Sequence, residues 1–304
     1  MLAPPKEVAS SPAGRDAVFG SRDCAWPANV QDLNPGAAQS SCRPFVGLLV
    51  PCTSAKTCDR TGRCWKTIDD TSLLKELAPS IFSTLAGCAC DCQVDACRPK
   101  VSTGSPHQRA AYDLIIYIGY DGNDAIYDTD TAREQLPERF EAALRANTKG
   151  GFSGAQLPRI GLRVVRCANS RSMVANSNCL SRTAHIDGAE YTYRVNDDTV
   201  FETPGWLETL PDALQSLDPP NVGVAGPRAT GGNWKVLTYD MVHRSHMEIF
   251  AGNRYPPSLK NWYSDDWITK VYSGDHSTKG RRSPAQDCAR ANGAACPDFK
   301  QGRM

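Results

Sequence analysis

The 304-residue sequence has no long hydrophobic run and no excess of charge of either sign. No stretch approaches the roughly 18 consecutive apolar residues that a membrane-spanning helix needs, so no membrane span is predicted. The 34 Lys and Arg residues are balanced by 33 Asp and Glu residues, which gives a net charge of +1. Nucleic-acid-binding proteins usually carry a basic face or stripe, whereas the basic residues here are scattered, so no nucleic-acid partner is expected.

The start of the chain also lacks a secretory signal, because Pro4, Pro5 and Lys6 and later charged residues interrupt any apolar run. The chain nevertheless contains 13 cysteines, nine of them between Cys24 and Cys97. Such cysteine usage is typical of oxidising compartments. If an upstream signal or anchor is missing from this chain, we expect a protein of the secretory pathway, in the Golgi lumen; otherwise its location stays open.

Short apolar runs alternate with amphipathic stretches along the middle of the chain. The predicted strands are 45–50, 114–120, 160–165 and 191–195, and the predicted helices are 71–86, 131–146 and 172–188. This alternation is typical of a mostly parallel sheet with helices on both faces, in which ligands bind beyond the carboxyl ends of the strands. The sequence therefore predicts an α/β fold.

Composition divides the chain into three parts. Residues 1–44 are rich in Pro, Ala, Ser and Gly without periodicity, which is typical of a flexible leader or stem. Residues 45–273 are expected to form one folded domain, and the cysteine-rich segment 87–108 is expected to be a surface insertion within it. Residues 274–304 are expected to be a divergent, poorly ordered tail.

The strongest local signal is Val195-Asn196-Asp197-Asp198-Thr199, which places adjacent acids at the carboxyl end of a predicted strand. Neighbouring carboxylates repel each other, so such a pair in a cleft usually needs a cation, and Mg²⁺ or Mn²⁺ takes oxygen ligands of this kind. The ion could bridge to a diphosphate and neutralise a leaving group. The alternative is a solvated turn, because Asn and Asp are common turn residues.

Several segments resemble those of GT-A glycosyltransferases, in the same order, between about residues 45 and 273. Residues 190–206 resemble the segment around the acidic DxD-type motif. Residues 45–54 resemble the opening strand, 115–128 the second strand and its turn, and 262–268 the second acidic motif on the acceptor side. The resemblance points to a group of protist and algal transferases with an N-D-D-T motif. It implies a GT-A-type, Rossmann-like catalytic domain that moves a sugar from a nucleotide-diphosphate sugar to an acceptor hydroxyl, metal-dependent and inverting.

The resemblance also implies roles for individual residues. Asp198 matches the metal-coordinating acid, and Asp197 and Asn196 match positions that contact the metal, the ribose or the donor sugar. The residues that match strand ends lining the nucleoside pocket are Pro51, Thr53 and Asp121. The implied partners are Mn²⁺ or Mg²⁺, a nucleotide-sugar donor with a UDP-sugar favoured, and a glycan or glycoprotein acceptor.

Asp265 and Asp266 are the candidate catalytic acids on the acceptor side. An acceptor hydroxyl is a weak nucleophile, so an inverting enzyme needs a carboxylate that takes its proton. We predict Asp266 as this base and Asp265 as the neighbouring candidate, for which the alternative is a helix N-cap. Trp262 and Trp267 flank the pair and are candidates for sugar contact, with hydrophobic packing as the alternative.

Histidines and cysteines leave further interpretations open. His243 and His246 are three residues apart, as two zinc ligands on one helical face would be. Cysteines are expected to be disulfide-bonded, with zinc as the competing explanation. The cysteines concerned are Cys88, Cys90, Cys92 and Cys97 in the insertion and Cys52, Cys58 and Cys64 around the first strand.

Two other functions compete with a glycosyltransferase. One is a catalytically inactive homologue of the same fold. The other is a cysteine-rich extracellular interaction protein, in which residues 24–97 are the functional module and the remainder is a scaffold.

Overall fold

The computed structural model describes residues 26–34, 43–54, 64–85, 111–146, 157–168, 171–202, 205–229, 236–272 and 298–301. The predicted insertion at 87–108 lies outside these ranges, as does the tail except for its last strand. None of the helices in the described ranges has the length and hydropathy needed to cross a membrane.

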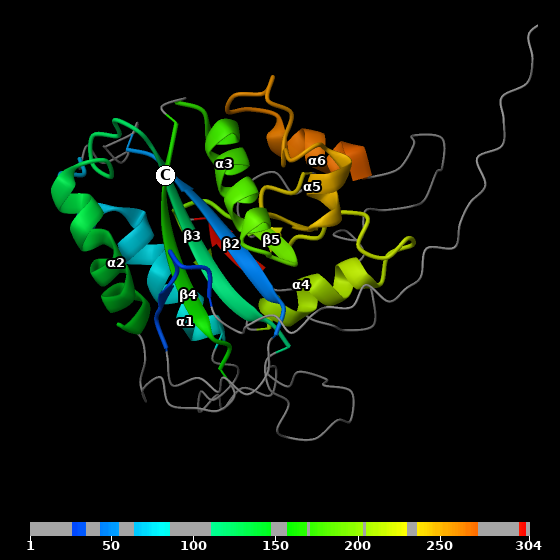
Figure 1. Ribbon diagram of the computed structural model, residues 1–304, viewed down its shortest axis with the longest axis horizontal. Helices are drawn as coiled ribbons and strands as arrows, with labels where there is room; N and C mark the ends of the chain where they lie inside the picture. The colour runs from blue at the N-terminus through cyan, green and yellow to red at the C-terminus, as the bar shows by residue number, and fades with distance from the viewer. Residues whose placement is uncertain are drawn as a thin grey trace, which may run out of the picture.

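A six-stranded sheet forms the centre of the protein (Figure 1). Its strands, in spatial order, are β1 (Gln31–Asp32), β4 (Ile160–Cys167), β3 (Asp113–Asp121), β2 (Phe45–Cys52), β5 (Tyr191–Arg194) and β8 (Asp240–His243). The four inner strands are parallel, and the edge strands β1 and β8 are antiparallel to their neighbours. The prediction of a mostly parallel α/β sheet is confirmed.

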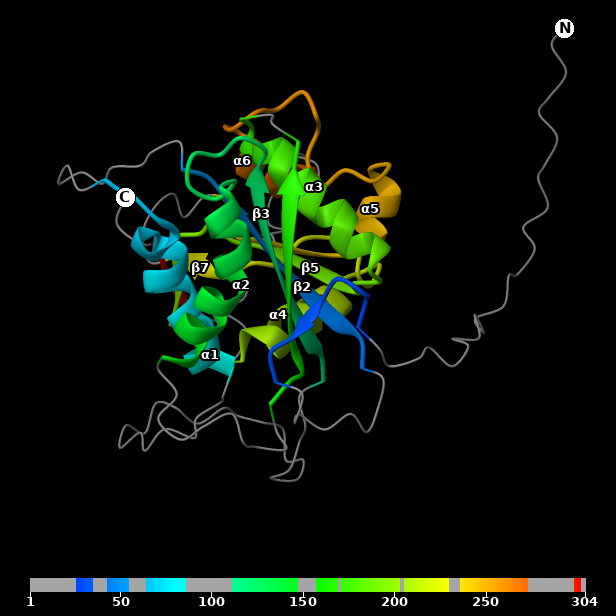
Figure 2. The ribbon, with the colours of Figure 1, turned by 60° about the vertical axis from the view of Figure 1, so that its left-hand side comes forward.

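The helices lie on both faces of this sheet. They are α1 (Ala78–Leu85), α2 (Asp130–Arg145), α3 (Met173–Ile186), α4 (Trp206–Gln215), α5 (Ser245–Ile249) and α6 (Ser264–Tyr272). A 3₁₀ turn, η1 (Ile68–Asp70), and a π-helical turn, η2 (Leu73–Leu77), precede α1. In Figure 2, α1 and α2 lie on one side of the strands and α3 on the other. The three predicted helices therefore exist, with ends shifted by a few residues.

Side chains along the inner strands point alternately to the two faces of the sheet, and both faces are buried. On β2, Val46, Leu48 and Val50 pack into the large core cluster beneath α1, α2 and α4. Leu49 points to the other face and joins a smaller cluster with Leu180 of α3. Because successive strand residues point to opposite faces, a strand covered on both sides needs a continuous apolar run, which this segment has.

The strand order changes direction between β2 and β5. From β2 the chain proceeds outward through β3 to β4, and it then returns to place β5 on the other side of β2. In open parallel sheets, ligands bind beyond the carboxyl ends of the strands at such a switch point. The segments at this point are 53–54, after β2, and 195–198, after β5.

The described structure extends beyond the predicted domain limits. Residues 26–34 fall within the expected leader, yet β1 pairs with β4 and Leu33 is only 1% exposed, so the core includes residues before Phe45. A second, three-stranded sheet contains β6 (Thr199–Phe201), β9 (Asp298–Gln301) and β7 (Arg228–Ala229), and so includes part of the expected tail.

Candidate functional site

A tight turn between β5 and β6 presents the two acids of the Asn-Asp-Asp-Thr segment. The backbone N–H of Asn196 donates to Oγ1 of Thr199 at 3.1 Å, and the backbone N–H of Thr199 donates to the carbonyl of Asn196 at 3.2 Å. Thr199 is fully buried, so its hydroxyl is a fixed acceptor. These bonds close the turn and place Asp197 and Asp198 at its tip. The motif is therefore a turn, but its acids are not solvated as the turn alternative expected, because Oδ2 of Asp197 and Oδ1 of Asp198 are buried.

The structure brings Asp197 to the end of β2. The backbone N–H of Thr53 donates to the Asp197 carboxylate, so a residue predicted to line the nucleoside pocket contacts a predicted metal ligand. Burial, followed by the repulsion of Asp198, raises the pKa of Asp197 to about 7. Burial also raises the pKa of Asp198. Both carboxylates are thus in an environment that disfavours their charged forms.

Two further acids, Asp124 and Glu76, interact with the Asp197 and Asp198 pair, which we call the metal corner. Oδ2 of Asp124, in the turn after β3, accepts a 2.7 Å hydrogen bond from the backbone N–H of Ser54, and its charge repels Asp197. Glu76 lies on η2, where burial and the Asp198 charge raise its pKa. The predicted Asp121 is the buried last residue of β3, three residues before the acid that contacts the loop after β2.

The acids fit a divalent cation. Oδ2 of Asp197 and Oδ1 of Asp198 are buried and have no hydrogen-bond partner, and the two charges repel each other. No group of three or more His, Cys, Asp or Glu side chains in the described ranges is placed to hold a metal ion. Mg²⁺ is often held by only one or two carboxylates, with phosphate and water completing its ligands. These residues therefore fit Mn²⁺ or Mg²⁺ as an oxygen-bound ion shared with a ligand.

A buried arginine lies behind the acids. Arg194, the last residue of β5, is 4% exposed, and its Nη1 donates to the carbonyl of Thr238 at 2.6 Å. Its Nη2 lies 3.1 Å from the sulfur of Met173, and its Nε has no hydrogen-bond partner. No direct ion pair joins it to Asp198, but its positive charge lowers the pKa of that acid and partly offsets burial.

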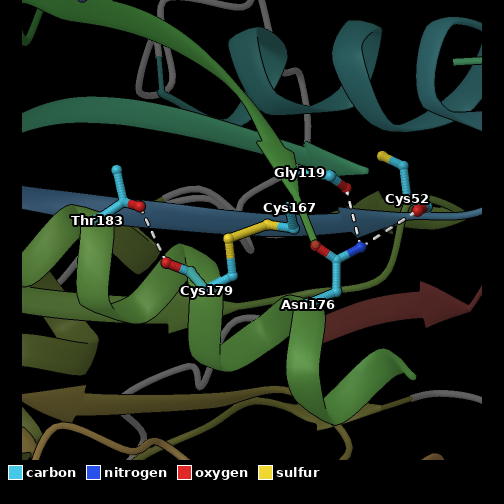
Figure 3. Close-up of a disulfide and its surroundings, with 6 residues drawn as sticks. All are labelled: Cys52, Gly119, Cys167, Asn176, Cys179 and Thr183. Atoms are coloured by element: carbon cyan, nitrogen blue, oxygen red, sulfur yellow. Dashed lines mark hydrogen bonds between the residues drawn. A yellow bond between two sulfur atoms is a disulfide. The ribbon is translucent and has the colours of Figure 1, made fainter. Parts of the chain in front are cut away.

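Helix α3 is fixed against the carboxyl ends of the strands by several independent contacts. Figure 3 shows the disulfide between Cys167, at the end of β4, and Cys179 on α3. One turn earlier on the helix, Nδ2 of Asn176 donates to the carbonyls of Cys52 at 3.4 Å and Gly119 at 3.3 Å. A Cβ at Gly119 would lie 2.6 Å from Leu180, so only glycine permits this close approach.

The first turn of α3 has its own partners for its backbone N–H groups. Ser172 is the N-cap, and its Oγ accepts from the backbone N–H of Ala175 at 3.2 Å. The N–H groups of Met173 and Val174 donate to Oδ1 of Asn261 at 2.8 Å and to the carbonyl of Lys260 at 2.9 Å. Because these donors are satisfied, this helix end is not a free anion site.

The predicted base lies on the segment that contacts α3. Asp265 and Asp266 are in the first turn of α6, and Oδ1 of Asp265 accepts from the backbone N–H of Asp266 at 3.0 Å. Asp266 also forms a 3.5 Å ion pair with Lys270. Figures 1 and 2 both place α6 near the start of α3, at the end of the sheet where the parallel strands finish. Trp267 instead packs against Phe250, with 5.1 Å between ring centroids.

The two histidines do not form a zinc pair on one helical face. His243 ends β8, and its Nε2 lies 3.0 Å from Oε1 of Glu190 while its Nδ1 lies 3.1 Å from Oγ of Ser245. His246 is on α5, and its Nε2 and Nδ1 contact the carbonyl of Arg254 at 2.9 Å and the hydroxyl of Tyr272 at 2.7 Å. All four ring nitrogens therefore have protein partners, which leaves none for zinc.

The cysteine predictions have mixed outcomes. Cys52 is a free, buried thiol on β2, so the expectation that it closes a short loop was wrong. Cys64 is disulfide-bonded, as expected. The Cys167–Cys179 bond was not predicted, because its two cysteines lie outside the cysteine-rich region. The four cysteines of the insertion, and Cys58, lie outside the described residues.

Sequence reasoning missed four residues near the site. Asp124 and Glu76 carried no signal beyond being acidic, because loop and helix surfaces are rich in such residues. Arg194 could have been noticed as a charged residue in a strand that is otherwise aromatic and buried. Asn176 gave little indication, since a polar residue in the first turn of a helix is usually solvated.

Comparisons with known proteins found only remote similarities. No protein-family model and no curated protein matches the sequence. The similar solved structures include S. aureus TarS, with 13% identity, a TM-score of 0.39 and coverage of 75% of this chain and 33% of that one. TarS residues 1–349 in complex with UDP-GlcNAc match with 14% identity, a TM-score of 0.39 and coverage of 75% and 53%. UDP-glucose pyrophosphorylase complexed with UDP-glucose matches with 10% identity, a TM-score of 0.36 and coverage of 76% and 88%. The match thus spans a third of the TarS chain and about half of its residues 1–349, and similarities this remote carry no argument.

Proposed function

We propose that this protein is a metal-dependent glycosyltransferase with a GT-A-type catalytic domain, which moves a sugar from a nucleotide-diphosphate sugar to an acceptor hydroxyl. The observation that carries the proposal is the pair of buried carboxylate oxygens without partners, on Asp197 and Asp198, at the switch point of a parallel sheet. Ligands of such sheets bind at this point. A diphosphate with a divalent cation is a ligand that matches unpaired carboxylates there.

Each residue has a role in this proposal. Asp198 and Asp197 would hold Mn²⁺ or Mg²⁺, which supplies positive charge for the leaving nucleoside diphosphate. The N–H of Thr53 orients the Asp197 carboxylate. Asn196 closes the turn that presents both acids. We further propose that a UDP-sugar is the donor and that Pro51 and Asp121, with Thr53, line the nucleoside pocket.

On the acceptor side we propose an inverting mechanism with Asp266 as the base. Its carboxylate would take the proton of the acceptor hydroxyl as the new glycosidic bond forms. Asp265 donates no proton in this scheme, and its bond to the backbone N–H of Asp266 supports the start of α6. We propose a glycan or glycoprotein as the acceptor. We propose a location in the secretory pathway, in the Golgi lumen if an upstream signal or anchor is missing from this chain; the disulfide between Cys167 and Cys179 is compatible with this, because such bonds persist in oxidising compartments.

The test is a screen of nucleotide-sugars for Mn²⁺-dependent hydrolysis, because slow transfer to water requires no knowledge of the acceptor. Asp198→Asn keeps the shape of the side chain but removes the charge that balances the ion, so donor binding and hydrolysis should collapse while the fold survives. Asp130→Asn is the matched control, since the Asp130 side chain is 89% exposed on α2. Hydrolysis at the wild-type level in Asp198→Asn would sink the assignment.

The same experiment separates the competing functions. Metal-dependent binding of a nucleotide-sugar without any hydrolysis would support an inactive homologue. The interaction-module alternative is less compatible with the structure, because β2 and α1 lie within residues 24–97 and β2 is an inner strand of the central sheet. That region therefore supplies the core of the fold and is not a separate module.

A further inference from the structure

Two adjacent aromatic side chains are exposed on the loop before α6. Trp262 is 79% exposed and Tyr263 is 70% exposed. Other large aromatic residues of the chain behave differently, since Trp206 is fully buried and Trp267 packs against Phe250. Single exposed apolar residues are common, whereas here two neighbouring aromatic side chains are both exposed.

The backbone of this loop is strained in a way that presents the rings. Tyr263 has φ of +68°, in the left-handed region that non-glycine residues seldom adopt. Its carbonyl accepts from the backbone N–H of Trp267 at 2.9 Å, so this conformation directly precedes the first turn of α6. Glycine would adopt it readily, whereas a side chain is disfavoured there. Strain of this kind is commonly found at binding sites.

The loop is hydrogen-bonded to the start of α3 through the two residues before the aromatic pair. Lys260 accepts hydrogen bonds at its carbonyl from Ser172 Oγ at 2.8 Å and from the N–H of Val174, and Asn261 accepts from the N–H of Met173. The sulfur of Met173 contacts Arg194, whose charge acts on Asp198. The two residues before the aromatic pair are therefore bonded to the start of α3, which contacts Arg194 through Met173.

We propose that Trp262 and Tyr263 form a platform for a pyranose ring of the acceptor, so that the acceptor is a glycan whose sugar stacks beside Asp265 and Asp266. This rests on the proposed function. A pyranose has an apolar C–H face that an aromatic ring can cover, while its hydroxyls need polar partners. The first turn of α6 provides both carboxylates within four residues of the rings.

The binding test uses simple methyl pyranosides as probes, because the natural acceptor is unidentified. Indole N–H signals are followed by NMR on the full chain, and a Trp262→Phe variant assigns the Trp262 signal. At least one pyranoside should shift this signal in a saturable manner. Trp262→Ala lacks the signal, so its affinity is compared with wild type by isothermal titration calorimetry and should be about tenfold weaker, which corresponds to one aromatic contact. No shift with any pyranoside, in protein that hydrolyses a nucleotide-sugar, would overturn the proposal.

Two variants separate binding from stability. Tyr263→Gly removes the ring and also relieves the left-handed strain, so the thermal midpoint should hold or rise while the affinity for the pyranoside falls. Ile186→Ala, at the end of α3 and 82% exposed, is the control for loss of an exposed apolar side chain and should change neither quantity. Unchanged pyranoside affinity in Tyr263→Gly and Trp262→Ala contradicts the platform.

The proposal and the proposed function can fail separately. A wild-type protein that hydrolyses no nucleotide-sugar but binds pyranosides at Trp262 refutes the transferase and keeps the platform. A wild-type dimer that becomes a monomer in Trp262→Ala assigns the surface to self-association and refutes the platform.

Discussion

The Cys167–Cys179 disulfide should contribute about 3 kcal/mol to the free energy of unfolding. The two cysteines are 12 residues apart in sequence, and closing a loop of that size removes about this much conformational entropy from the unfolded chain. The perturbation is the double variant Cys167→Ala/Cys179→Ala, which avoids leaving a lone reactive thiol. For a core of this size, such a loss lowers the thermal midpoint by roughly 6–12 °C.

The assay is urea unfolding at 25 °C, followed by tryptophan fluorescence and by circular dichroism. The unfolding midpoint should fall and the slope should rise only slightly, because a cross-link over 12 residues restricts only a small part of the unfolded chain. A chemical reductant is not an adequate substitute for the variant, because it would also open the disulfide at Cys64. The reasoning is refuted if the double variant loses less than about 1 kcal/mol, or if peptide mapping of the oxidised protein finds free thiols at both positions.

The remaining predictions concern buried charge and the base. Burial lowers the pKa of His246 from 6.5 to about 4, so the unfolded chain binds more protons between these values. Stability should therefore fall as the pH drops from 6.5 to 4, by roughly 3 kcal/mol in total, and His246→Gln should flatten this dependence in urea unfolding across the range. Arg254→Met leaves the fully buried Asp240 without its ion-pair partner and should cost about 3–5 kcal/mol of unfolding free energy. The double variant Arg254→Met/Asp240→Leu should recover much of this loss. Equal losses in both variants would contradict this account. Asp266→Asn should lower transfer by ~10²-fold while nucleotide-sugar affinity holds, as steady-state kinetics would show, and a parallel loss of affinity would make Asp266 structural.

The main secondary structure followed from local patterns in the sequence. The run at 45–50 could be assigned to a strand because it is apolar at every position, which only a strand covered on both faces requires. The amphipathic pattern at 131–146 predicted α2 for the opposite reason, since one face of that helix meets the core. Adjacent acids after β5 were also visible in the sequence, because a strand end followed by Asn-Asp-Asp is a local pattern. The predicted fold class needed nothing more than this alternation.

Contacts between distant segments were decided only by the tertiary structure. No local sequence pattern indicates that the N–H of Thr53 donates to Asp197, that Cys167 bonds to Cys179, or that Cys52 is a free thiol. The strand order set these distances, because placing β5 beside β2 brings two loops more than 140 residues apart to one corner. The histidines also show that local spacing is not enough. Their spacing resembled that of a ligand pair, but His243 ends β8 and His246 lies on α5, and each ring nitrogen has a protein partner. A local pattern fixes which face of an element is apolar, whereas the pairing of faces depends on packing across the whole core.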